Sequence, residues 1–255
     1  MEINGTLSAI VTGGASGLGE ATARMLSSMG AKVAIFDLDI EKGSTIAKEL
    51  NSDFYEVDVS DVNSVNKAVL DFSKQNEGIQ VAVNCAGIGP AAKTVSRGEA
   101  HSSELFAKVI NINLIGTFNV ASVCAAQMVK NDKHSEDGLR GVIINTASVA
   151  AYDGQVGQAA YSASKSGVVG LTLPMARDLS DKGVRVCSIA PGLFLTPLLE
   201  SLPTEVQESL GGQVPFPSRL GKPKEFAHLV CHIIENDMLN GEVIRLDGAI
   251  RMAPR

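Results

Sequence analysis

Short runs rich in valine and isoleucine alternate along the whole chain with longer stretches of helical pattern. We predict strands at residues 7–12, 32–37, 54–58, 81–84, 142–146, 184–189 and 242–246. We predict helices at residues 18–29, 40–50, 62–75, 103–113, 115–130, 159–181 and 224–235. Apolar strands separated by helices are typical of a parallel sheet covered on both faces. The alternation therefore predicts the α/β class, with a doubly wound sheet of seven parallel strands flanked by helices.

Nothing in the composition divides this alternation into two domains. No linker rich in proline or serine interrupts the 255 residues, so we predict a single domain over 1–255. Residues 193–223 differ, because they hold five prolines and no steady helical period apart from a short helix expected at 204–210. An irregular stretch of about 30 residues in a compact domain is usually functional. We predict a substrate lid there, with a plain surface excursion as the alternative.

The turn after the first predicted strand is rich in glycine and leads directly into a predicted helix. It reads Thr12-Gly13-Gly14-Ala15-Ser16-Gly17-Leu18-Gly19. Glycines let a backbone approach a pyrophosphate closely, and the helix N-terminus supplies amide donors and the positive end of a dipole. Strand, glycine-rich turn and helix together predict a Rossmann-type dinucleotide site. The alternative is a glycine-rich turn without a ligand.

An acidic residue ends the second predicted strand. Asp37 follows Gly19 by eighteen residues, the distance at which a carboxylate accepts hydrogen bonds from the adenosine ribose. Its charge would repel a 2′-phosphate, Leu38 follows it, and residues 12–19 hold no Lys or Arg. The sequence therefore favours NAD over NADP. The alternative is that Asp37 only caps the next helix.

A tyrosine and a lysine lie four residues apart in the sixth predicted helix. Tyr161 and Lys165 would stand one turn apart on the same face, thirteen residues or more beyond Ser148. A free tyrosine has a pKa of about 10, and we expect the lysine cation to lower it. With Ser148 holding a substrate oxygen, the three side chains predict a proton-transfer site for an alcohol or a carbonyl. A surface tyrosine and lysine on an ordinary helix are the alternative.

Taken together, these features resemble the short-chain dehydrogenase/reductase family, and the resemblance covers essentially the whole chain. Asn84-Cys85-Ala86-Gly87 stands where that family has Asn-Asn-Ala-Gly, so this chain lacks one amide side chain near the adenine pocket. Asn113 matches the asparagine that supports a proton relay in the family. Asp58-Val59 and Pro191-Gly192 match the segments that contact the adenine and the nicotinamide end.

The resemblance implies a role for each matching residue. It implies that the catalytic residues are Asn113, Ser148, Tyr161 and Lys165. It implies that the residues contacting NAD are Gly13, Ser16, Gly17, Leu18, Gly19, Asp37, Asp58, Val59, Asn84, Cys85, Ala86, Gly87, Tyr161, Lys165, Pro191, Gly192, Phe194 and Thr196. It implies that the substrate contacts Ser148, Gln155, Gln158 and Tyr161.

The resemblance also implies a reaction, which is reversible hydride transfer between NAD and a short-chain 3-hydroxyacyl-CoA in a homotetramer. We expect an apolar wall for the acyl chain from Leu193, Phe194, Leu195, Leu198 and Leu199. Lys93 and Arg97 either meet the phosphates of CoA or are solvated surface charges. Two alternatives stay open: a hydroxysteroid or other secondary-alcohol dehydrogenase of the same family, and a non-catalytic dinucleotide-binding protein.

The net charge and the cysteines indicate which partners and which compartment to expect. The net charge is −6 without a basic block, so we expect no nucleic-acid partner. No run approaches the ~20 apolar residues of a membrane span, so we expect no membrane partner. His228 and His232 have no third ligand nearby in the sequence, and we expect no metal. Four scattered cysteines and an N-terminus without a signal pattern predict a cytoplasmic protein, with the mitochondrial matrix as the alternative.

Overall fold

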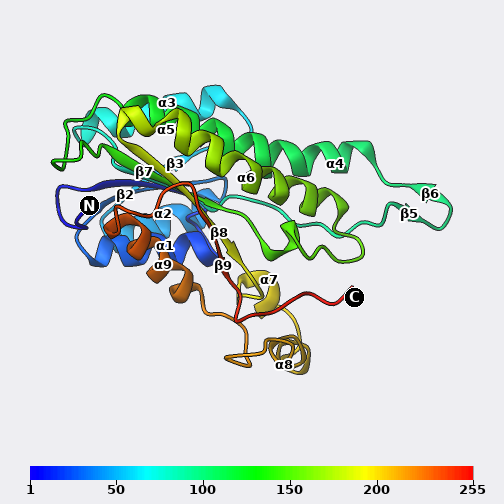
Figure 1. The fold of residues 1–255 in the computed structure, drawn as a ribbon. Helices are drawn as coiled ribbons and strands as arrows, with labels where there is room; N and C mark the ends of the chain where they lie inside the picture. The colour runs from blue at the N-terminus through cyan, green and yellow to red at the C-terminus, as the bar shows by residue number, and fades with distance from the viewer. Residues whose placement is uncertain (255) are drawn as a thin grey trace.

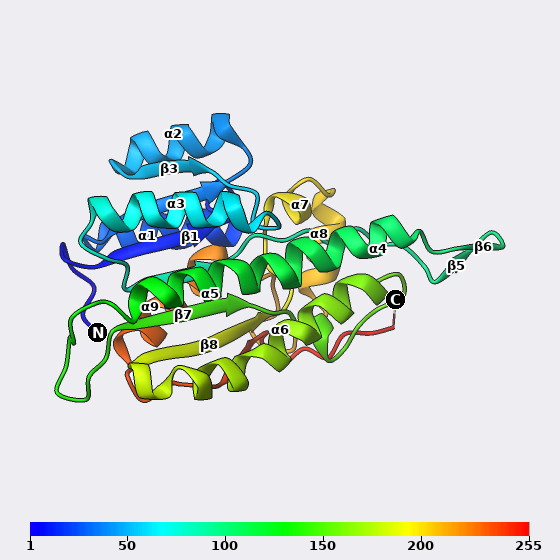
Figure 2. The ribbon, with the colours of Figure 1, turned by 90° about the horizontal axis from the view of Figure 1, so that it is seen from above.

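The computed structural model describes residues 1–254, except for the side chain of Leu198, and a sheet of seven parallel strands forms its centre. The strands lie in the order β3-β2-β1-β4-β7-β8-β9 (Figures 1 and 2). Their bounds are β1 Ser8–Thr12, β2 Lys32–Asp37, β3 Asp53–Glu56, β4 Val81–Asn84, β7 Gly141–Thr146, β8 Val184–Pro191 and β9 Val243–Leu246. The direction of winding reverses between β1 and β4, so the predicted doubly wound α/β fold is confirmed.

Helices cover both faces of the sheet, and their bounds lie close to the predicted ones. The helices that pack on one face are α1 Gly17–Ser28, α2 Ile40–Leu50 and α9 Pro223–Glu235. Those on the other face are α3 Val62–Gln75, α5 Gly116–Met128 and α6 Ala159–Asp178. Apolar side chains from the sheet therefore divide between two cores, one on each face.

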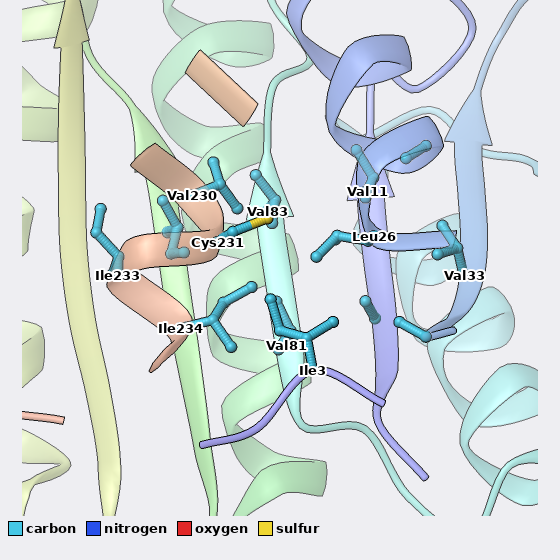
Figure 3. Packing of buried hydrophobic residues seen from close by; sticks show 14 of the residues in the cluster. Ile3, Val11, Leu26, Val33, Val81, Val83, Val230, Cys231, Ile233 and Ile234 are labelled. Atoms are coloured by element: carbon cyan, nitrogen blue, oxygen red, sulfur yellow. The ribbon is translucent and has the colours of Figure 1, made fainter. Parts of the chain in front are cut away.

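The core beneath α1 and α9 is packed from aliphatic side chains of the two helices and the central strands. Leu26 of α1 and Ile233 of α9 are fully buried in one cluster with Val81 and Val83 of β4 (Figure 3). Burial of a leucine or isoleucine side chain is worth about 1.5–3 kcal/mol. This packing fixes the strands, and with them the side chains at their carboxyl ends.

The two helices predicted at 103–113 and 115–130 form one continuous helical rod. It begins as α4 (Ser103–Ile110), passes through a π-helical segment (Asn111–Ile115) and continues as α5. The predicted break at residue 114 is wrong, because the backbone there continues through wider i→i+5 turns and forms no loop. The rod is long and apolar enough to cross a membrane by length and composition, but half of its apolar window is buried in the fold. A buried core helix meets the same criterion, so length and composition alone are weak evidence for a membrane span.

Strands β5 and β6 and helix α7 lie in stretches where the sequence indicated no regular structure. A hairpin of β5 (Val95–Ser96) and β6 (Glu99–Ala100) projects away from the body of the molecule (Figures 1 and 2). Helix α7 (Pro197–Glu200) is a single turn, and α8 (Thr204–Gly211) confirms the short helix predicted at 204–210.

The excursion at residues 193–223 leaves and returns to the fold at the same place. The Leu195 N–H donates to the Gly221 carbonyl at 2.8 Å, and the Gly221 N–H donates to the Leu193 carbonyl at 2.8 Å. Phe194 is buried between these two ends, and its ring would collide with any side chain at position 221. The base of the excursion is therefore closed, while α7 and α8 lie beyond it. Its role as a lid stays a prediction.

Candidate active site

A cavity of about 890 Å³ runs along the carboxyl edge of the sheet. Residues that follow β1, β2, β4, β7 and β8 contribute to it, which is where ligands bind in doubly wound folds. The predicted site residues that line it are Gly13, Ser16, Gly17, Leu18, Gly19, Asp37, Asp58, Val59, Cys85, Ala86, Gly87, Ser148, Gln158, Tyr161, Lys165, Pro191, Gly192, Phe194 and Thr196. Asn84, Asn113 and Gln155 do not line it.

The glycine-rich turn brings bare backbone to the mouth of the cavity. Gly13 has a positive φ of 64°, and a Cβ there would stand 2.8 Å from the backbone nitrogen of Ala86, so only glycine fits. Ser16 precedes the first residue of α1, yet its side chain caps no N–H of the helix. The amides and the hydroxyl at this helix N-terminus are thus available to an anion, which fits a dinucleotide pyrophosphate.

Asp37 holds the glycine-rich turn in place. One carboxylate oxygen accepts from the Ala15 N–H at 3.0 Å, and the other accepts from the Asp39 N–H at 3.0 Å. The alternative that Asp37 caps the next helix is wrong, because the cap of α2 is Asp39, which accepts from the Lys42 N–H. The carboxylate of Asp37 is fixed at the wall of the cavity before any ligand binds.

Ser148 and Tyr161 meet at the reacting end of the cavity. Ser148 follows β7, is buried, and accepts from the Ala150 N–H at 3.1 Å. Burial raises the pKa of Tyr161 above its ordinary value, while a hydrogen bond with Ser148 lowers it by less. The expectation of a lowered tyrosine pKa is therefore wrong for the protein on its own, because the mostly buried phenolate loses more hydration than Ser148 returns.

Lys165 is buried and has lost much of its preference for the charged form. Its Nζ donates to the Thr146 carbonyl at 2.7 Å and lies 5.8 Å from the centre of the Tyr161 ring. Burial lowers the pKa of this ammonium from 10.5 to about 8. With a pKa of about 8, the lysine is largely neutral at the higher pH at which the buried phenol of Tyr161 ionises, so its charge does not offset the burial of Tyr161.

Asn113 stands in the π-helical segment, behind the cavity wall. Its Oδ1 accepts from the Ile88 N–H at 2.8 Å, and its Nδ2 donates to the Ile88 carbonyl at 2.8 Å and to Ser164 Oγ at 3.0 Å. Ser164 Oγ in turn donates to the Tyr161 carbonyl at 2.7 Å. Asn113 thus joins the loop after β4 to the helix that carries Tyr161 and Lys165. A catalytic contact of its own stays a prediction.

The segment after β4 divides between structure and cavity. The Asn84 Nδ2 donates to Asn145 Oδ1 of β7 at 2.9 Å, so this buried side chain joins two strands rather than facing the cavity. Cys85 does line the cavity, and it accepts from Thr146 Oγ1 at 3.6 Å. Burial raises the pKa of its thiol to about 11, so the thiol is the form present near neutrality.

Of the two glutamines expected at the substrate, only Gln158 lines the main cavity. Gln158 lines the main cavity and also a neighbouring one of about 500 Å³, which Lys93 lines as well. Gln155 lines only the neighbouring cavity, and its Nε2 donates to the Ala253 carbonyl at 2.9 Å. The structure thus departs from the expectation for Gln155, because the C-terminal backbone takes the hydrogen bond assigned to the substrate.

Sequence reasoning missed several residues that line the cavity. They are Phe36, Val57, Ile88, Gly89, Ala91, Lys108, Ile112, Thr146, Ala147, Val149, Ala150, Pro197 and Met252. Phe36, Val57, Ile88, Ala147 and Val149 stand next to a predicted residue at a strand end, so extending those motifs by one position would have found these five. Met252 had no such signal, because only tertiary contacts bring the C-terminus here. Of the expected apolar wall, Leu193, Phe194 and Leu199 line the cavity, Leu195 does not, and the side chain of Leu198 lies outside the described part.

Known proteins that are similar to this chain cover nearly its full length. The short chain dehydrogenase family matches residues 8–207. The 3-hydroxyacyl-CoA dehydrogenase type-2 of Bos taurus is 57% identical over 253 residues, or 97% of this chain and 96% of the relative. The enzyme of that name from Homo sapiens is 56% identical over 252 residues, with 97% and 96% covered. The crystal structure of 3-hydroxyacyl-CoA dehydrogenase type-2 from Mycobacterium avium superposes with a TM-score of 0.93, at 42% identity and 100% coverage of both chains.

Proposed function

The chain belongs to the short-chain dehydrogenase family, and on this premise we propose that it interconverts short-chain 3-hydroxyacyl-CoA and 3-ketoacyl-CoA by hydride transfer with NAD. One observation carries the proposal: Ser148, Tyr161 and Lys165 line the same cavity as the glycine-rich turn. A proton-transfer site and a dinucleotide site in one cavity are what such a reaction requires. The names of the relatives in cattle and humans support the acyl-CoA substrate.

The cofactor is a nicotinamide dinucleotide, as in other dehydrogenases of the family, and we infer that it is NAD. The fixed carboxylate of Asp37 would accept from the ribose hydroxyls and repel a 2′-phosphate. Leu38, which is 60% exposed beside it, offers no positive charge. Both residues line the cavity.

The preference for NAD can be tested by removing the carboxylate that would repel a 2′-phosphate and adding a positive charge that would attract it. Asp37→Ala combined with Leu38→Arg should move the ratio of kcat/KM for NADP over NAD upward by about 100-fold, since charged hydrogen bonds contribute about 1.5–3 kcal/mol each. The ratio is the readout because the loss of the Ala15 contact should weaken both cofactors alike. Leu38→Arg alone is the control. An unchanged ratio in the double variant would show that the ribose is read elsewhere.

A dinucleotide held along the glycine-rich turn would supply the hydride chemistry, its oxidised form taking the hydride and its reduced form giving it, while the side chains of this chain handle the proton. Tyr161 stands where its hydroxyl can give a proton to the substrate oxygen during reduction and take it back during oxidation. Ser148, which is hydrogen-bonded to Tyr161, can hold the same oxygen. Lys165 is anchored by the Thr146 carbonyl and faces the Tyr161 ring. Asn113 keeps the helix of Tyr161 in register with the loop after β4.

The surroundings of this centre suit an acyl thioester. Leu193, Phe194, Leu199 and Met252 line the cavity and offer an apolar surface to a short chain, each buried methylene being worth about 0.8 kcal/mol. Gln158 lines both this cavity and the next, which leads to Lys93. We therefore propose that Lys93 meets a CoA phosphate.

Arg97 has a different position from Lys93. It stands in the turn between β5 and β6, at the tip of the projecting hairpin (Figure 2). Arg97 lines neither the main cavity nor the neighbouring one, whereas Lys93 lines the latter. Of the two cations, Lys93 therefore has the position that suits a CoA phosphate.

A substrate panel tests the proposal as a whole. Acetoacetyl-CoA and 2-methylacetoacetyl-CoA should be reduced with NADH at far higher kcat/KM than free acetoacetate or a keto-steroid. Lys93→Gln should raise KM for acetoacetyl-CoA up to about fivefold, as expected for one lost contact of a solvent-exposed charge, but not KM for the N-acetylcysteamine thioester, which has no phosphate. A preference for a steroid would favour the hydroxysteroid alternative. Absence of NADH oxidation with every carbonyl would favour a non-catalytic dinucleotide-binding protein.

We also propose a compartment for this enzyme. All four cysteines are free, and three of them are buried, which suits a reducing environment. The cytoplasm is our first choice and the mitochondrial matrix the alternative. Fractionation with antibodies against the native protein separates them.

A further inference from the structure

The last described residues of the chain return to the reacting end of the main cavity. Met252 lines that cavity together with Ser148, Gln158 and Tyr161. In Figure 2 the C-terminus lies beside the loop that leads into α6. Chain ends fray unless specific contacts hold them, so a terminal residue in a cavity wall calls for an anchor.

Two hydrogen bonds tie the C-terminal backbone to the loop before Tyr161. Gln155 Nε2 donates to the Ala253 carbonyl at 2.9 Å, and the Val156 N–H donates to the Pro254 carbonyl at 3.0 Å. Both distances are those of well-formed N–H···O bonds. They hold the two residues that directly follow Met252.

An ion-pair cluster fixes the path that leads to this segment. Arg245 in β9 pairs with Asp153 at 2.6 Å and with Asp247 at 2.8 Å, and it also donates to the Ile250 carbonyl at 3.0 Å. The side chains of Arg245 and Asp153 are 21% and 19% exposed, so water screens the pair only partly. The same loop that receives the C-terminus is therefore also attached to the strand from which the C-terminus departs.

The loop at residues 153–158, which holds the C-terminal segment, also contacts residues of the cavity wall. The Gln155 N–H donates to Gln158 Oε1 at 3.0 Å, and Gln158 lines the main cavity. On its other side, the Gly157 carbonyl accepts from the Ala92 N–H at 2.8 Å, next to Ala91, which lines the cavity too. Gln155 thus stands between the C-terminus and a residue of the cavity wall.

We propose that residues 252–254 form a latched wall of the substrate cavity, in which Met252 limits the length of the acyl chain and Gln155 is the positioning residue that holds the segment closed. The proposal rests on the proposed function, since it names the part of the site that reads the acyl group. Gln155 then acts on the substrate through Met252 and Gln158 and makes no contact of its own.

The specificity of Met252 is tested by shortening its side chain. Met252→Ala should raise the ratio of kcat/KM for 3-oxohexanoyl-CoA over acetoacetyl-CoA by about tenfold, because a pocket enlarged by a few methylene-sized groups accepts a longer chain. Met252→Leu, which keeps the volume, should restore the ratio. KM for NADH should stay unchanged in both variants. An unaltered ratio in Met252→Ala overturns the role of this residue.

The latch is tested with a substitution that keeps the size of Gln155 but removes its donor. Gln155→Glu cannot donate to the Ala253 carbonyl, and it should raise KM for acetoacetyl-CoA about fivefold, as the loss of one hydrogen bond worth about 1 kcal/mol predicts, with kcat changed less than twofold. Gln75→Glu, at the end of α3, adds the same charge away from the cavity and is the matched control. A chain ending at Met252 removes both acceptors and should show the larger increase. Equal KM values in all three variants overturn the latch.

Amide hydrogen exchange separates failure of this inference from failure of the proposed function. The Val156 amide donates to Pro254, so a peptide that covers residues 153–158 should exchange at least tenfold faster in the chain ending at Met252 than in the full chain. This readout needs no substrate. If the full chain reduces no acyl-CoA but the exchange difference is found, the wall stands and the substrate is wrong. If exchange is unchanged, the C-terminus is not docked and the inference falls, whatever the substrate.

Discussion

Tyr161 shows how far a single residue depends on its surroundings. Burial raises the pKa of its phenol, and Ser148 offsets only part of that increase. A neutral phenol is a ready proton donor but a poor base. The neutral phenol therefore suits proton donation during carbonyl reduction, and positive charge near the ring would favour the phenolate that the reverse step needs.

The first prediction concerns that phenol. Tyr161→Phe should lower kcat for acetoacetyl-CoA reduction by about 100–10,000-fold, the contribution of a general acid, and leave the Kd for NADH within about twofold. Steady-state kinetics and fluorescence titration of NADH give the two numbers. Tyr152→Phe is the control, since this tyrosine is 49% exposed and does not line the cavity. Near-normal turnover in Tyr161→Phe contradicts the mechanism.

Lys165 leads to a second prediction, on stability against pH. Its pKa is about 8 in the folded protein and about 10.5 when exposed, so between these values the unfolded chain binds more protons and stability rises with pH. Below pH 8 both states are protonated, and the buried charge destabilises the folded state in full.

Replacing Lys165 by an uncharged residue should therefore increase the free energy of unfolding most at neutral pH. The free energy of unfolding of Lys165→Met minus that of the wild type should fall by roughly 2–4 kcal/mol between pH 7 and pH 10.5. Urea titrations across this range measure it, with the surface variant Lys67→Met as control. A difference that does not change with pH would mean that Lys165 keeps its ordinary pKa. The buried ammonium of Lys165 thus lowers the stability of the folded protein, although the active site requires this side chain.

The residues of the site were predictable where chemistry and position coincide. Asp37 and Ser148 follow strands, and Tyr161 and Lys165 share a helix face, so motif and topology pointed to the same edge of the sheet. Gln155 was misplaced because its proximity to Tyr161 in sequence says nothing of which partner its amide meets. Met252 was missed because its place depends on contacts with the distant loop at 153–158.

Among the elements, α9 depends on a residue from a strand. The buried Arg185 of β8 donates to the carbonyls of Ile233 and Ile234 in the last turn of the helix, at 2.9 Å each. It also donates to the Leu239 carbonyl at 2.8 Å. One guanidinium thus satisfies helix-terminal carbonyls that have no partner within the helix.

The third prediction follows from this cap. Arg185→Met should lower the free energy of unfolding by about 3–5 kcal/mol, because three carbonyls lose a buried charged donor. Arg24→Met, which removes the exposed ion pairs with Glu20 and Glu49, should cost about 1 kcal/mol or less. Urea unfolding measures both. Similar losses in the two variants would contradict a capping role for Arg185.

Elements with a repeating apolar pattern were predictable, and those fixed by local geometry were not. The π-helical segment at Asn111–Ile115 has the same residue types as an α-helix, so nothing in the sequence marks its wider turns. The β5–β6 hairpin turns at Arg97 and Gly98, both with positive φ, where an asparagine followed by glycine is the usual signal. Its two-residue strands are too short to show an alternation.

At the scale of the whole molecule, the sheet gathers residues from distant parts of the sequence at one edge. Gly13, Asp37, Ser148 and Pro191 each follow or end a different strand, yet all line one cavity. The order of strands could be predicted from the alternation, since doubly wound sheets have few topologies. The arrangement of the excursion at residues 193–223 could not be predicted. It is fixed by hydrogen bonds between its two ends, at Leu193, Leu195 and Gly221, and such contacts leave no repeating apolar pattern in the sequence.

The neighbouring helices α4, α5 and α6 form a face of the molecule that carries exposed apolar side chains. Phe106 of α4, Phe118 of α5 and Ile115 between them are 40%, 45% and 44% exposed, and Leu173 of α6 is 44% exposed. Ile115, Phe118 and Leu173 belong to the helices at residues 115–130 and 159–181, which the family resemblance implies to pair across a subunit interface. Exposed apolar patches of this kind mark association surfaces.

We therefore predict a homotetramer with this face at one of its interfaces. Light scattering at micromolar concentration should give the mass of four 26.6 kDa chains. Phe118→Glu would place a charge in a buried contact, at a cost of several kcal/mol, and should reduce the particle to dimers or monomers. Val62→Glu is the control, because this residue is similarly exposed, at 43%, but begins α3, outside the assigned helices. Because Ile115 ends the π-helical segment that holds Asn113, loss of the interface should also lower kcat. A monomeric wild type with full activity would contradict both the assembly and its link to the site.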